Sequence, residues 1–152
     1  MASSTPPAFH DAEDVLCDLL EQAVNASPSD GGAGKLQPRP AFYTFLPTDY
    51  SSMLDTQPIV VVQRIGGVAT QRGQVDNALI ELGAVAKTRA QAWHVLGNLR
   101  AWIAADGYRN ATTPARIVSL EEVQGPTTPV WINPDHRYVK TIVQLNLRKP
   151  RT

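Results

Sequence analysis

The sequence predicts an α+β domain in which a mixed or antiparallel β-sheet carries two α-helices packed on one face, with long loops. Two segments have apolar residues at helical spacing, and several others have β-branched or alternating patterns. Their order along the chain is α, β, β, β, α, β, β, β. The 152 residues suit one domain at 9–148, between a flexible arm at 1–8 and a basic tail at 149–152.

The first helix is expected to open at His10 or Asp11 and to end between Asn25 and Pro28. Its acidic residues lie near the N-terminal end, where the helix dipole favours them. A buried stripe is predicted from six apolar residues at helical spacing: Val15, Leu16, Leu19, Leu20, Ala23 and Val24. The Ser, Gly and Pro content of residues 27–40 predicts a loop.

Three strands are expected before the second helix. A short aromatic strand spans 41–46 and is stopped by Pro47, and a second loop follows at 48–57. Residues 59–65 (IVVVQRI) are β-branched and nearly continuous, which predicts a central strand that ends at Gly66 and Gly67. Residues 75–85 predict the next strand, because their even positions from 78 to 84 are apolar.

The second helix is predicted at 88–105, with Thr88 as its N-cap and Gly107 as the glycine just beyond its end. A strand at 114–123 follows, then a turn at Gly125 and Pro126 and a short edge strand at 130–132. Residues 138–148 alternate between apolar and polar side chains, which predicts a strand with one buried face.

The charge is balanced in total but divided along the chain. The sequence has 14 basic and 14 acidic residues; residues 1–60 hold two bases and eight acids, and residues 61–152 hold twelve bases and six acids. The neutral balance argues against a dedicated nucleic-acid or anionic-membrane binder. Charged residues are only 18% of the chain, which favours a protein that buries surface against partners.

Two interpretations of the divided charge are open. Either both regions are simply solvated, or an acidic face of one copy docks on a basic face of the next. Trp131 is either part of the core or an interface anchor, since Trp is enriched at binding hot spots. The candidate interface residues are Asp11, Asp14, Asp18, Arg64, Arg72, Trp131, Arg137, Lys140 and Arg148.

No motif for catalysis or metal binding is found. His10, His94 and His136 lack metal-ligand spacing, and the single Cys17 on a helix is typical of a small, half-buried apolar residue. The glycines after residue 65 do not continue as a phosphate-binding loop. Glu121 and Glu122 would point to opposite faces of a strand. We therefore expect no catalytic residue, cofactor or metal, and no apolar run is long enough to span a membrane.

The layout resembles the tail terminator proteins of long-tailed bacteriophages with siphovirus tails. The resemblance is carried by residues 11–16 (DAEDVL), by 58–67 (PIVVVQRIGG), by the strand and helix within 75–103, and by the late strand 138–148. It covers most of residues 10–148, and Arg-Ile-Gly-Gly after an apolar strand is its most specific part.

The resemblance implies a structural virion protein of the phage tail and neck, present in the host cytoplasm during assembly. Such proteins form a hexameric ring on the head-proximal end of the tail tube, stop tube polymerisation and join the tail to the head connector. The implied partners are further copies, the major tail tube protein, the head–tail connector proteins, and DNA that passes through the lumen without sequence-specific binding. The loops at 27–40 and 47–57 and the turn at 66–73 are expected to contact the tube or neighbouring copies.

Other readings of the sequence are a head completion or head–tail connector protein (stopper or adaptor) of the same neck assembly, a tail-tube subunit, an enzyme and a DNA-binding module. The strand-rich order with a helix in its middle favours the terminator over a helical adaptor. An enzyme would need a pocket with convergent polar groups, and the sequence shows none.

Overall fold

The computed structural model describes residues 8–34, 36–70, 72–128 and 137–151. Nearly all of the arm predicted at 1–8 lies outside these residues. So do Trp131 and the short strand predicted at 130–132.

The described residues form a mixed six-stranded sheet with the strand order β1-β2-β4-β6-β5. β1 (Ala41–Tyr43) pairs in parallel with β2 (Ile59–Gly66), and the remaining pairs are antiparallel. These join β2 to β4 (Val75–Ala86), β4 to β6 (Arg137–Arg148) and β6 to β5 (Arg116–Thr127). The two-residue β3 (Ala69–Thr70) pairs only with β4. The predicted α+β class is confirmed, and the sheet is mixed.

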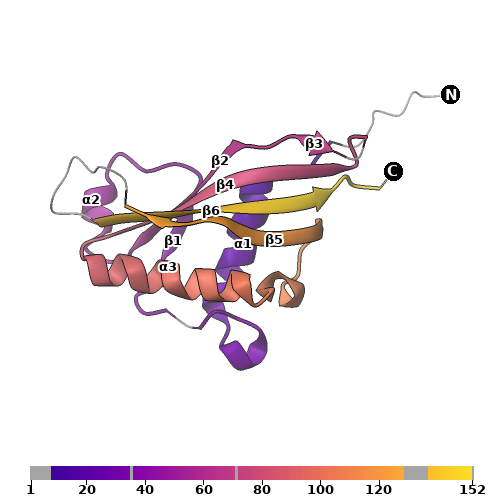
Figure 1. Ribbon diagram of the computed structural model, residues 1–152. Helices are drawn as coiled ribbons and strands as arrows, with labels where there is room; N and C mark the ends of the chain where they lie inside the picture. The colour runs from indigo at the N-terminus through magenta and orange to yellow at the C-terminus, as the bar shows by residue number, and fades with distance from the viewer. Residues whose placement is uncertain (1–7, 35, 71, 129–136, 152) are drawn as a thin grey trace.

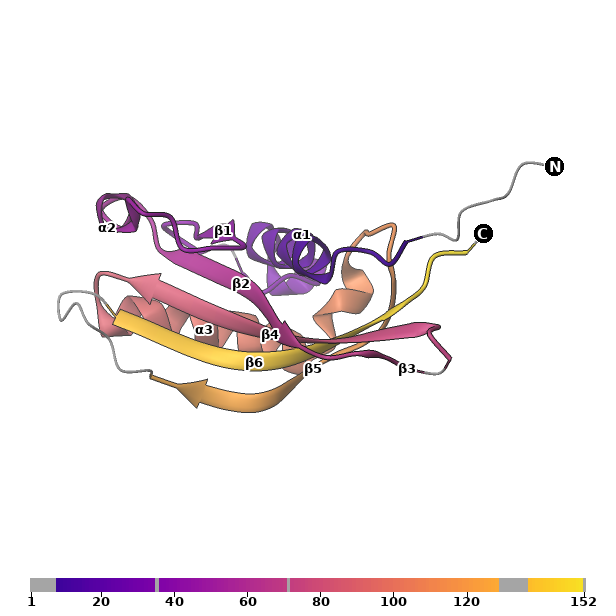
Figure 2. The ribbon, with the colours of Figure 1, turned by 90° about the horizontal axis from the view of Figure 1, so that it is seen from above.

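Two helices, α1 (Ala12–Asn25) and α3 (Arg89–Ala104), share one core with the same face of the sheet. α3 runs beneath β4 and β6, and α1 lies against β2 (Figures 1 and 2). The whole predicted stripe of α1 is buried, as are the even positions of β4 from Ala78 to Ala84. The odd positions of β6 from Val139 to Leu147 are buried too, so its alternation was interpreted correctly.

The opposite face of the sheet carries a smaller apolar cluster at one end. The short helix α2 (Tyr50–Met53) leads into Leu54, which packs with Ile59, Val61 and Val85. The sequence predicted only a loop at 48–57. A four-residue helix has too little periodic pattern to be recognised, and burial of Leu54 supplies the stabilisation that its sequence does not.

The turn predicted at Gly125 and Pro126 is wrong, because β5 continues to Thr127. β5 is an edge strand, and its register against β6 shifts at three places between Ile117 and Thr127. An edge strand tolerates proline, since its outward N–H needs no partner in the sheet. The first strand is also shorter than predicted and ends at Tyr43.

The end of α3 differs from the prediction in one residue. Asp106, with φ +54°, adopts the left-handed conformation expected of Gly107. Gly107 instead lies against Trp102, where an added Cβ would come within 2.2 Å of the indole Nε1. That Nε1 donates a hydrogen bond of 3.1 Å to the carbonyl of Gly31, which fixes the ring above the glycine. A glycine is required at position 107 because a side chain would not fit beside Trp102, and not because of the backbone conformation there.

Candidate assembly surfaces

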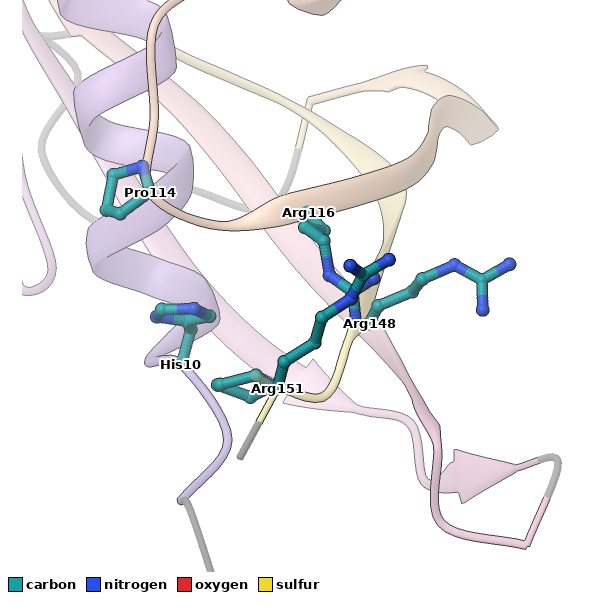
Figure 3. A pocket seen from close by; sticks show the side chains of 6 residues that line it. His10, Pro114, Arg116, Arg148 and Arg151 are labelled. Carbon is teal, nitrogen blue, oxygen red and sulfur yellow. The ribbon is translucent and has the colours of Figure 1, made fainter.

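A basic cavity lies where β5 begins and β6 ends. Arg116 and Arg148 are direct cross-strand partners there, so their side chains leave the same face of the sheet. The cavity has a volume of about 420 Å³, and Figure 3 shows the side chains around it. Its lining residues are His10, Pro114, Arg116, Arg148, Pro150 and Arg151.

The arginines of this cavity form no ion pair with any described carboxylate. The only hydrogen bond from the Arg116 side chain to another described group goes from Nη2 to the carbonyl of Lys149, at 3.1 Å. Like charges placed directly opposite one another weaken an antiparallel pair by up to about 1 kcal/mol. The cavity is therefore a cationic site, and no described carboxylate offsets the repulsion between its arginines.

The second charged surface is the outward side of α1, which we call the acidic stripe: Asp11, Asp14, Asp18 and Glu21. Asp11 is the N-cap and accepts hydrogen bonds from the backbone N–H of Glu13 and Asp14. The helix contains no Lys or Arg. Within the described residues no member of the stripe forms an ion pair. Asp14 and Asp18 are one turn apart, so they repel each other as well.

The negative charge of the acidic stripe affects the thiol of Cys17. The pKa of its thiol is raised from 9.0 to about 12, first by burial and then by the negative charges of Glu21, Asp14, Asp18 and Glu13. A thiol with that pKa stays protonated at neutral pH and is a poor nucleophile. This agrees with the expected role of Cys17 as a half-buried apolar residue.

Arg64 uses its guanidinium within the chain. Its Nη1 and Nη2 donate to the two carboxylate oxygens of Asp76 at 2.8 and 2.7 Å, and its Nε donates to the carbonyl of Gly66. The hydrogen bond to Asp76 raises the pKa of Arg64. The backbone N–H of Arg64 also donates to the Glu13 carboxylate at 2.8 Å. An interface role for Arg64 stays a prediction; its observed contacts tie α1 and β4 to the end of β2.

The other basic candidates are spread over the molecule. Arg72 is exposed in the turn between β3 and β4, with φ +59°. The Nζ of Lys140 lies 3.6 Å from the Glu81 carboxylate, which also accepts a hydrogen bond from the Tyr138 hydroxyl. Arg137 is at the opposite end of β6 from Arg148, about 36 Å away at about 3.3 Å per residue. Only Arg148 of the predicted set lines the basic cavity.

Arg116 and Arg151 complete the cavity and were not singled out from the sequence. The sequence places Arg151 only in the basic tail at 149–152. Arg116 faces Arg148 because of the β5–β6 register, which contains three shifts that no sequence pattern indicates. A cluster of Arg148, Lys149 and Arg151 in the sequence was the one available signal.

The described residues contain no group of three or more His, Cys, Asp or Glu side chains placed to hold a metal ion. None of the described helices is long and apolar enough to cross a membrane. Glu121 and Glu122 do point to opposite sides of β5. Glu122 pairs with Arg100 of α3 and accepts a hydrogen bond from Thr141, and these contacts lower its pKa.

Comparison with known proteins bears on the identity of the chain. No curated protein matches it. A family model described as phage tail termination protein matches residues 8–152, a span that includes both long helices and every described strand. The resemblance seen in the sequence is confirmed: the chain belongs to the phage tail termination protein family.

Proposed function

We propose that this chain is a structural virion protein that forms a ring on the head-proximal end of the tail tube. The ring stops tube polymerisation and joins the tail to the head connector. The family match over residues 8–152 is the observation that carries this proposal. We propose six copies in the ring, on the resemblance alone.

The two charged surfaces support self-assembly. The chain presents an acidic stripe and a basic cavity, and neither is neutralised by the described residues. Surfaces of opposite sign on one chain favour head-to-tail contacts, which close into a ring when the rotation between copies allows it. We propose that DNA passes through the lumen of this ring without sequence-specific contacts.

The hairpin formed by the end of β2, β3 and the start of β4 supports contact with the tube or the connector. It projects beyond the core of the sheet (Figure 1). Its side chains Ile65 and Val68 are 50% and 67% exposed. Exposed apolar side chains on a projecting element favour a protein-binding surface. We propose that this hairpin meets the tube or the connector, and that the chain has no catalytic role.

Electron microscopy of phage particles made without this chain tests the proposal. We expect tails of uncontrolled length that are not attached to heads, and restoration of normal virions when the wild-type chain is supplied in trans. Tails of normal length lying free beside filled heads would refute the terminator role in favour of a connector. Complete, normal virions would refute both.

A further inference from the structure

We propose that the basic cavity of one copy receives the acidic stripe of a second copy, with Asp14 and Asp18 of the second copy set between Arg116 and Arg148 of the first. This inference rests on the proposed ring and names the surfaces that close it. The occupant is a second copy of this chain.

The cavity is built to take two negative charges side by side. Arg116 and Arg148 are cross-strand partners, and Arg151 and His10 stand on the rim of the same cavity (Figure 3). Directly opposed residues on an antiparallel pair have Cβ atoms about 5 Å apart. Two arginines that start from neighbouring Cβ atoms can each reach one of a pair of carboxylates, because each guanidinium forms charge-assisted bonds with a carboxylate.

The acidic stripe supplies that spacing. Residues i and i+4 of a helix have Cβ atoms about 5–6 Å apart, and Asp14 and Asp18 are such a pair. Both are exposed and unpaired within the described residues. A rigid helix therefore presents two carboxylates on Cβ atoms spaced like those of the two arginines, and the arginine side chains become ordered when the contact forms.

The contact that we propose is made between copies, because these charges are unpaired within the described residues of their own chain. Glu13 is the acidic residue of α1 that bonds to its own chain, through the backbone N–H of Arg64. Asp14 and Asp18 point outward from the domain and make no ion pair with their own cavity. In such a contact the first copy keeps a free stripe and the second keeps a free cavity, so the charges are all paired only when the assembly closes on itself. A nucleic-acid phosphate would neutralise the cavity but would leave the stripe unpaired.

Charge reversal on each surface separately, and then on both, tests the contact with the purified full chain. The acid-reversed variant carries Asp14→Arg and Asp18→Arg, and the base-reversed variant carries Arg116→Glu and Arg148→Glu. Self-association is measured by sedimentation velocity in NaCl of about 0.05 M and about 0.5 M. We expect the wild type to associate more strongly at low salt, and each variant alone to associate at least about tenfold more weakly, because like charges then meet.

Mixing the two variants is the decisive experiment. The reversed stripe of one fits the reversed cavity of the other, and the two wild-type surfaces fit as well. The mixture should therefore assemble, in even-numbered rings with alternating chains, and the chain that carries all four changes should assemble alone. Matched controls are Arg39→Glu and Asp49→Arg, which reverse exposed charges outside both surfaces and should associate like the wild type. Circular dichroism confirms that each variant is folded, since Arg near the start of α1 opposes the helix dipole.

Several results would overturn the inference. These are a wild-type chain that stays monomeric at low salt, variants that associate like the wild type, or a mixture that does not recover. Duplex DNA binding that is lost in the base-reversed variant, with self-association unchanged, would assign the cavity to phosphate instead. Tail length is scored separately, in phage particles made with each chain. Tails of uncontrolled length made with a chain whose contact is intact would refute the proposed function alone. Tails of normal length made with a chain that lacks the contact would refute this inference alone.

Discussion

Replacing Arg64 by methionine removes the positive charge that faces Asp76 at the end of β2 while keeping an unbranched apolar side chain. Asp76 has a side chain only 8% exposed, whereas that of Arg64 is 33% exposed. The replacement therefore leaves a nearly buried carboxylate without its partner. It also removes the hydrogen bonds that Arg64 donates to the carbonyls of Gly66 and Gly67.

The magnitude follows from burial. Breaking a fully buried ion pair by removing one partner costs about 3–5 kcal/mol, because the remaining charge is left unsolvated. Water reaches a third of the Arg64 side chain, so we expect a loss of about 2–3 kcal/mol in the free energy of unfolding. For a chain of this length such a loss lowers Tm by about 4–12 °C. Urea unfolding followed by circular dichroism measures the free energy directly.

Arg100→Met is the matched control, since it breaks a bidentate pair with Glu122 in which the two side chains are 36% and 27% exposed. We expect that loss to stay near or below about 1 kcal/mol, because water solvates the carboxylate that remains. Adding Asp76→Asn to Arg64→Met should recover part of the loss, since no buried charge is then left. If Arg64→Met cost no more than Arg100→Met, or if the second change recovered nothing, the argument from burial would be wrong.

Three further predictions concern the hairpin, the acidic stripe and Cys17. Gly67→Ala should destabilise the fold by at least about 2 kcal/mol, because Gly67 has φ +96° and an added Cβ would lie 1.8 Å from a carbonyl oxygen of β4. Gly66→Ala is the control in the same unfolding assay, since an added Cβ fits there. Asp14→Asn with Asp18→Asn should speed alkylation of Cys17 at about pH 8, because removing two negative charges lowers the raised pKa of the thiol. In the wild type the free energy of unfolding should fall as pH rises from 9 to about 12, since the unfolded thiol loses its proton first, and Cys17→Ala should abolish that part of the slope. An alkylation rate unchanged by the two substitutions would show that burial alone sets this pKa.

Much of the fold could be predicted from the sequence because its main elements each have a buried side and an exposed side. The stripe of α1 and the alternation of β6 repeat often enough to identify both the element and its buried face. The elements that were missed are short or irregular. β3 has two residues, α2 has four, and the shifted register of β5 lets that strand continue through Pro126.

The surfaces were harder to predict than the core, because they depend on which distant residues meet. The acidic residues of α1 lie close together in the sequence, so periodicity alone places them on one side of the helix. Arg116 and Arg148 are far apart in the sequence, and only the β5–β6 register brings them together. The partner of Arg64 could not be predicted either: its side chain reaches Asp76 of β4 in the folded chain, while its interface role stays a prediction.

Two groups of charged side chains in the described domain thus have different consequences. One group is paired inside the chain: Arg100 with Glu122 links α3 to β5, and Arg64 with Asp76 adds a side-chain contact between the paired strands β2 and β4. The other group is the acidic stripe and the basic cavity, where like charges are held together on rigid elements and repel one another in the isolated chain. Repulsion of this kind weakens the monomer but is relieved when surfaces of opposite sign meet. A chain built in this way gains stability from assembly itself, and the gain should decline as salt screens the charges.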